Sequence, residues 1–171
     1  QVFVHGCTRA AVADVEASRD LIVGTAEKPL ERMAARGGGL RGMDVAYLPE
    51  TGLLRLQLHI DVRDAMGANT ADSVAEAVRP LVEKLTGGTV LMAILTNSGT
   101  GRRAGARFSA PVSKLARGGF NGATAAARIE LASRLAKEDP NRAVTHNKGI
   151  MNGVTAIALA TGNDTRGLEA A

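Results

Sequence analysis

Aromatic residues are almost absent from this sequence. Its 171 residues include no Trp, one Tyr and three Phe, so aromatic residues make up 2% of the chain. Hydrophobic residues still make up 45%, so a core must be built from Ala, Val, Leu, Ile and Met. Proteins that bind single-stranded nucleic acids stack bases on aromatic side chains. The shortage of aromatic residues therefore argues against that class of protein.

Cysteine, long apolar runs and metal-ligand spacings are scarce as well. The single cysteine, Cys7, excludes an internal disulfide and predicts a reducing compartment, which we take to be the cytoplasm. No run of about eighteen apolar residues occurs, which predicts that no helix crosses a membrane. The three histidines, His5, His59 and His146, lack metal-ligand spacing, so we expect no metal site.

The charge balance is basic, with a formal net charge of +4 and a sequence pI near 9.7. A basic balance is compatible with nucleic-acid binding. However, the Arg and Lys residues are scattered along the chain, and an anionic small ligand explains the charge at least as well.

The first part of the chain shows a regular alternation of strand and helix patterns. Leu54, Leu56, Leu58 and Ile60 alternate with polar residues, which indicates a half-buried strand. Together the patterns give the order β-α-β-β-α-β of a ferredoxin-like fold. We predict an α+β protein whose residues 1–98 form such a small domain. The expected elements are a strand at 1–4, a helix at 10–36 interrupted at Pro29, strands at 43–48 and 53–62, a helix at 70–85 ended by Gly87-Gly88, and a strand at 89–96.

The composition changes after Asn97. A connector rich in Gly, Thr and Arg at 98–105 leads to a predicted strand at 107–112, a loop at 118–122 and a helix at 123–137. Asp139 and Pro140 then signal a second helix, which should run to about residue 160. We interpret residues 99–171 as a mainly helical, incomplete part of a larger domain, so the sequence reads as a piece of a longer polypeptide.

The segment DVRDAMGANT, residues 61–70, lies between a predicted strand and a predicted helix. Its glycine would let a ligand approach the backbone, and the N–H groups at a helix start suit a phosphate or pyrophosphate. The alternative is a plain turn before a helix capped by Asn69 or Thr70.

Two further segments carry charged residues on or beside a predicted helix. On DPNRAVTHNKGIMNG, residues 139–153, Lys148 would either extend its charge into water or, if half-buried, stabilise an oxyanion. Asp164 would either cap the next helix or hold Lys148 charged and fixed, which requires the chain to turn at Gly162.

Taken together, DVRDAMGANT (61–70), DPNRAVTHNKGIMNG (139–153) and LATGNDTR (159–166) resemble class II 3-hydroxy-3-methylglutaryl-CoA (HMG-CoA) reductase over essentially the whole chain. The resemblance implies that residues 1–98 bind NADH or NADPH on a ferredoxin-like domain. The stretch Glu27 to Glu31, before the triple glycine, leaves the choice between the two open. The residues implied in cofactor binding are Asp64, Met66, Gly67, Asn69 and Asn97.

The resemblance also implies a catalytic role for two charged residues. Lys148 matches the catalytic lysine, and Asp164 matches the aspartate that is hydrogen-bonded to it. Arg142 and Asn152 match residues that hold the hydroxymethylglutaryl group. The implied reaction interconverts HMG-CoA with mevalonate and free CoA through two hydride transfers, without a metal.

The resemblance implies two further catalytic residues that do not occur among these 171 residues. The family uses a glutamate in an upstream ENVIG-like segment and a histidine near its C-terminus, and neither is present here. We therefore predict that this chain alone is inactive. Family members form dimers or dimers of dimers with shared active sites, so a homo-oligomer is implied. The alternatives are a ferredoxin-like nucleic-acid-binding module and an interaction module without catalysis.

Overall fold

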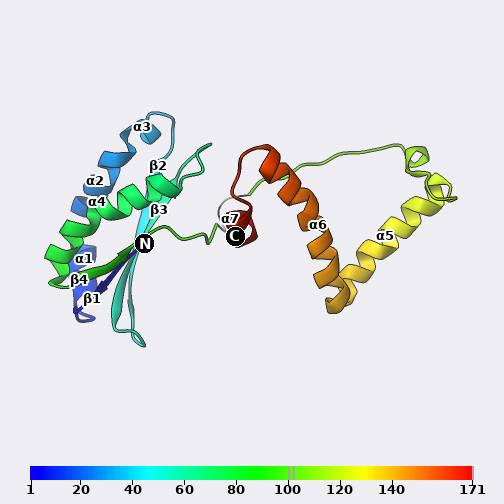
Figure 1. Cartoon of the computed structure of the whole chain (residues 1–171). Coiled ribbons are helices and arrows are strands. Elements are labelled where there is room, and N and C mark those ends of the chain that lie inside the picture. The colour runs from blue at the N-terminus through cyan, green and yellow to red at the C-terminus, as the bar shows by residue number, and fades with distance from the viewer. Residues whose placement is uncertain (100, 102, 171) are drawn as a thin grey trace. The chain divides into compact units, whose positions relative to one another are not determined.

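The computed structural model describes residues 1–99, 101 and 103–170. The chain divides into two compact units, Gln1–Asn97 and Ser98–Ala171. The first unit combines a sheet with helices, and the second contains helices joined by irregular segments (Figure 1).

The sheet of the first unit has four strands. They are β1 (Val2–His5), β2 (Gly39–Leu48), β3 (Leu53–Asp61) and β4 (Thr89–Ala93). Their order is β2-β3-β1-β4, and every neighbouring pair is antiparallel. Because β1 lies between β3 and β4, the two β-α-β halves of the first unit interleave in one sheet. This is the ferredoxin-like arrangement, and it confirms the predicted α+β fold class.

The alternation along β3 places the core on one face of the sheet. Leu54, Leu56 and Leu58 are buried, whereas the polar residues between them are at least partly exposed. Successive side chains of a strand point to opposite faces, so the leucines share the covered face. The helices of the first unit lie on this side of the sheet (Figure 1).

The covering helices are α1 (Ala11–Ala17), α2 (Arg19–Glu27), the short η1 (Lys28–Leu30), α3 (Glu31–Ala34) and α4 (Ala68–Thr86). The sequence predicts one helix over residues 10–36 with a single interruption at Pro29. This prediction is wrong, because the backbone already leaves helical geometry at Ser18. The core contains only the residue types expected from the composition: Val2, Val4, Ala11, Val15, Ile22, Ala26, Leu30, Met33, Met43, Leu54, Leu56, Leu58, Val62, Val74, Ala75, Val78, Val82 and Val90.

The second unit contains η2 (Val112–Leu115), α5 (Gly122–Glu138), α6 (Pro140–Ala160) and α7 (Thr165–Ala170). Helix α6 starts as predicted: Pro140 is its first residue, and Asp139 Oδ1 accepts a 2.9 Å hydrogen bond from Asn141 N. The predicted strand at 107–112 is wrong. Residues 103–111 have no regular structure, since Pro111 has no N–H and the described part of this unit offers no strand to pair with.

The described part of the second unit buries very little apolar surface. Ala158 is its one buried hydrophobic residue among those the structure describes. Most large apolar side chains of α5 and α6 are exposed, namely Ile129, Leu131, Leu135, Val144, Ile150, Val154, Ile157 and Leu159. Over residues 1–99, 101 and 103–170, no helix combines the length and apolar character that a membrane crossing requires.

Candidate functional site

The segment predicted to bind a cofactor forms a tight loop between β3 and α4. Val62 is buried at its start, whereas Asp64 and Met66 are exposed. The backbone N–H of Ala65 donates a 3.0 Å hydrogen bond to the carbonyl of Val62. The loop therefore turns back on its buried first residue and presents the side chains at positions 64 and 66 to solvent.

Gly67 ends this loop and begins α4. Its φ of +88° is in the left-handed region, and a Cβ at this position would lie 2.7 Å from Val62 Cγ2. Only glycine fits such a position without strain. The prediction that Asn69 or Thr70 caps the helix is wrong, because the N-cap is Gly67 and no side chain caps α4. A glycine N-cap has no side chain that could accept from the N–H groups of the first turn, the groups to which anions bind at helix starts.

Asn97 is exposed on the segment that follows β4. Asp72 Oδ1, one turn into α4, accepts a 2.8 Å hydrogen bond from the backbone N–H of Leu95. This bond ties the segment leading to Asn97 to the helix that the loop opens. Leu95, two residues before Asn97, is thus held to α4, the helix that begins after Gly67.

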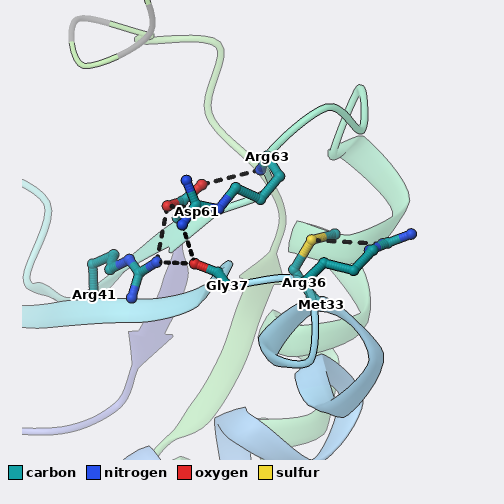
Figure 2. Close-up of polar contacts among 6 residues, drawn as sticks. All are labelled: Met33, Arg36, Gly37, Arg41, Asp61 and Arg63. Carbon is teal, nitrogen blue, oxygen red and sulfur yellow. Dashed lines mark hydrogen bonds and ion pairs between the residues drawn. The ribbon is translucent and has the colours of Figure 1, made fainter.

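A cluster of charged residues at the start of the loop was not predicted. It consists of Asp61 at the end of β3, Arg41 on β2, Arg63 in the loop and the carbonyl of Gly37, and we call it the Asp61 cluster (Figure 2). The hydrogen bond from Arg41, followed by that from the Arg63 backbone, holds the pKa of the Asp61 carboxyl below its usual range. The alternation of β3 places Asp61 on a polar face, but only the register with β2 reveals Arg41 as its partner.

The residues predicted to act on the substrate lie in the second unit. Arg142, Lys148 and Asn152 are exposed on α6. Lys148 and Asn152 are four residues apart and share a helix face, whereas Arg142, six residues before Lys148, lies on another side.

Asp164 follows the turn that ends α6, where Gly162 has a φ of +69°. Its Oδ1 accepts hydrogen bonds from Arg166 N at 3.0 Å and Gly167 N at 3.1 Å, so it caps α7. Among the described residues no ion pair joins Lys148 to Asp164. The capping geometry is present, and the pairing with Lys148 stays a prediction.

A hollow of about 360 Å³ lies between α5 and α6. Its lining includes Lys137, His146 and Asn147 but none of the predicted catalytic or substrate-binding residues. Over the described ranges, no three His, Cys, Asp or Glu residues are grouped closely enough to hold a metal ion.

Comparison with known proteins agrees with the resemblance in the motifs. Residues 1–171 match the sequence model of the family hydroxymethylglutaryl-coenzyme A reductase. The chain is 40% identical over 144 residues to a probable 3-hydroxy-3-methylglutaryl-coenzyme A reductase of Borreliella burgdorferi, covering 84% of this chain and 33% of the relative. It is 37% identical over 165 residues to the reductase of Archaeoglobus fulgidus, covering 94% and 36%. The chain thus spans about a third of these curated relatives.

Solved structures give the same result. The 3-hydroxy-3-methylglutaryl-coenzyme A reductase of Streptococcus pneumoniae matches with a TM-score of 0.75 and 35% identity, over 99% of this chain and 46% of that one. A class II reductase from the same organism, bound to NADPH in open conformations, also has a TM-score of 0.75, with 34% identity, over 99% of this chain and 47% of that one. Since the family model matches every residue and the fold agrees, this chain belongs to the hydroxymethylglutaryl-coenzyme A reductase family.

Proposed function

We propose that this chain supplies the cofactor-binding domain and the catalytic-lysine segment of an enzyme that interconverts HMG-CoA with mevalonate and CoA. The match of all 171 residues to the reductase family carries this proposal. Under it, residues 1–98 bind the cofactor, and residues 99–171 form part of the domain that binds the substrate.

The loop and the start of α4 fit a nicotinamide dinucleotide. Gly67 carries no side chain that would keep a pyrophosphate away from the backbone, and the first turn of α4, whose N-cap is this glycine, would offer N–H donors to it. Asp64, Met66, Asn69 and Asn97 would contact the rest of the molecule. When bound, NADH or NADPH supplies the hydride for each reduction.

Lys148 would stabilise the negative charge that grows on the substrate's carbonyl oxygen. In the reductive direction the thioester is first reduced to a thiohemiacetal, which releases the CoA thiol and leaves an aldehyde. The aldehyde is then reduced to the alcohol of mevalonate. Each reduction places negative charge on the same oxygen, and an ammonium group close to it lowers the barrier.

Three other residues would orient the reacting groups. Asp164 would pair with Lys148 and keep its ammonium protonated and in place. Arg142 would bind the terminal carboxylate of the hydroxymethylglutaryl group, because a guanidinium matches a carboxylate in charge and geometry. Asn152 would donate or accept a hydrogen bond on the same group. We expect no metal in this chemistry.

The oligomeric state and the partners proposed here come from the family resemblance, and the location comes from the single cysteine. We propose that the protein acts in the cytoplasm as a dimer or a dimer of dimers with shared active sites. Its partners would be HMG-CoA, mevalonate and CoA, and not nucleic acids or a membrane. The remaining catalytic groups, a glutamate and a histidine, are not among these residues, so the 171-residue chain should bind cofactor without forming mevalonate.

The test separates binding from turnover. Titration of NADH and of NADPH into the purified chain, followed by nicotinamide fluorescence, should show saturable binding of at least one of them. An assay for mevalonate with the same preparation should show none. Mevalonate formation by the isolated chain would contradict its predicted inactivity.

Two aspartate variants make the binding test specific. Asp64→Ala should weaken binding, because position 64 is exposed on the loop. Asp14→Ala, which removes an exposed carboxylate on α1, should leave it unchanged. If neither dinucleotide binds the unmodified chain, the cofactor-binding part of the proposal is wrong.

A further inference from the structure

The chain direction at the start of the loop depends on an unusual backbone conformation. Among the described residues, Arg63 is the one non-glycine residue with a positive φ, at +51°. Such a conformation is unfavourable for a residue with a side chain and persists only where surrounding groups hold it. Here the backbone N–H of Arg63 donates a 3.0 Å hydrogen bond to Asp61 Oδ1, two residues earlier. Asp61 therefore stabilises the turn that starts the loop.

The second oxygen of Asp61 joins the loop to the sheet. Asp61 Oδ2 lies 3.0 Å from Arg41 Nη2 on β2 and 3.7 Å from Arg63 Nε in the loop. Figure 2 shows both guanidinium groups gathered around this carboxylate. One side chain thus connects two strands and the loop at the point where the sheet ends.

The triple-glycine turn completes the Asp61 cluster. The carbonyl of Gly37 accepts hydrogen bonds from Arg41 Nη2 at 2.5 Å and from Arg63 Nη2. The turn is packed closely against the end of β3, since a Cβ at Gly38 would lie 2.6 Å from the carbonyl oxygen of Asp61. Both arginines therefore direct N–H donors at protein acceptors, which favours a structural role for them over one in binding an external anion.

Two contacts with Val62 connect the residues after Arg63 to the start of the loop. Ala65 N bonds back to the carbonyl of Val62, and Gly67 packs against the Val62 side chain. Both contacts tie the residues after Arg63 to the buried start of the loop. A change at Asp61 should consequently move the side chains at positions 64 and 66.

We propose that Asp61, through Arg41, Arg63 and Gly37, is a positioning residue that holds loop 62–67 in the conformation that binds the nicotinamide cofactor. This inference rests on the proposed function, because that function gives the loop its ligand. Asp61 acts here through the loop backbone, and it sets cofactor affinity by keeping the free loop ordered.

Binding and amide hydrogen exchange together test the inference. Asp61→Ala should raise the dissociation constant for NADPH or NADH about tenfold, since a disordered loop must be ordered on binding. It should also speed the exchange of the Arg63 and Ala65 amides, which NMR resolves one residue at a time. Asp61→Asn keeps an oxygen that can accept from Arg63 N but loses the charge, so its effects should be smaller.

Asp44→Ala is the matched control. Asp44 Oδ2 lies 2.5 Å from His59 Nε2, so it also forms a cross-strand pair on the β2–β3 hairpin, away from the loop. This variant should alter neither the affinity nor the exchange of Arg63 and Ala65. Circular dichroism establishes that each variant folds, and if Asp61→Ala does not fold, Asp61→Asn and Arg41→Gln decide by the same two measurements.

The possible results distinguish the inference from the proposed function. If the unmodified chain binds cofactor and Asp61→Ala binds equally well, the inference is wrong and the proposed function stands. A weaker affinity with unchanged exchange would also overturn it, because Asp61 would then act by contact with the cofactor. If the unmodified chain binds neither dinucleotide, the cofactor role proposed for the domain fails, and this inference fails with it.

Discussion

Asp72 on α4 and Leu95 after β4 are joined by a 2.8 Å hydrogen bond from the leucine N–H to the aspartate carboxylate. The bond forms where β4 has already ended, at Ala93. It keeps the departing chain beside α4 for two more residues, up to the segment that carries Asn97. The Asp72 side chain thus holds the chain one residue beyond the last backbone pairing, in which Ile94 N donates to Gln1 O at 2.9 Å and Gln1 N donates to Ile94 O at 2.8 Å.

Removing this acceptor should destabilise the first unit. We expect Asp72→Ala to lower the free energy of unfolding by about 1–3 kcal/mol, because the partly buried N–H of Leu95 loses its partner. Asp72→Asn keeps an acceptor oxygen and should cost less. Urea unfolding followed by circular dichroism measures both. Equal losses in the two variants would mean that the charge of Asp72, and not its hydrogen bond, stabilises the fold.

Gly67 should not tolerate a side chain. Gly67→Ala should destabilise the first unit by at least ~1 kcal/mol, the usual cost of a left-handed conformation for an L-residue, with the contact to Val62 adding to it. Gly24→Ala is the control, since Gly24 is exposed within α2 and a Cβ there meets nothing within 4 Å. It should stabilise the protein by about 0.5–1 kcal/mol. Thermal unfolding of the two variants would show shifts of opposite sign, and shifts of the same sign would contradict this prediction.

Asp61 should give the stability of the first unit a characteristic pH dependence. The charged groups around its carboxylate are Arg41 and Arg63, and they hold its pKa in the folded protein below the ordinary value of about 3.9. Its contribution is therefore fully present above that ordinary value and is lost as the pH falls through the lowered folded pKa. Asp61→Asn lacks this titration.

The difference in unfolding free energy between the unmodified chain and Asp61→Asn should thus be constant near neutral pH and shrink in acid. Urea unfolding at a series of pH values measures it, and carboxylates that both proteins share cancel in the difference. A difference that grows in acid would show that the folded-state pKa of Asp61 is raised instead.

Two leucines of the sheet should contribute very differently to the free energy of unfolding. Leu56 is fully buried at the centre of β3 and pairs with Val2 and Val45. Leu56→Ala should cost about 2–5 kcal/mol. Leu91 is 59% exposed, at the irregularity between β1 and β4, and Leu91→Ala should change stability by less than about 0.5 kcal/mol. Comparable losses in the two variants would show that this face of β4 is covered in solution.

The architecture of the first unit was accessible from sequence because its determinants are local. The alternation of leucines along β3 and the glycine that ends α4 each specify an element without help from distant residues. The start of α4 was not accessible in the same way. Sequence rules look for a capping side chain such as Asn69 or Thr70, whereas the structure begins the helix at a glycine whose conformation depends on contact with Val62.

The candidate site likewise contains residues that the sequence could identify and residues that only the folded structure reveals. The residues of loop 62–67 could be identified from their order and from the family resemblance. The Asp61 cluster could not, because Arg41 reaches Asp61 only through the pairing of Gly39 with Asp61 across the hairpin. The predicted strand at 107–112 failed for a related reason: strand residues are stable only beside a partner strand, and none is present in the described part of that unit.

The uneven distribution of the core determines what calorimetry of this chain would report. All buried hydrophobic residues that the structure describes, apart from Ala158, belong to the first unit. The heat-capacity change of unfolding comes mainly from newly exposed apolar surface. The ferredoxin-like domain should therefore supply almost all of the heat-capacity increase, whereas unfolding of the helices in residues 98–171 should absorb heat with little change in heat capacity.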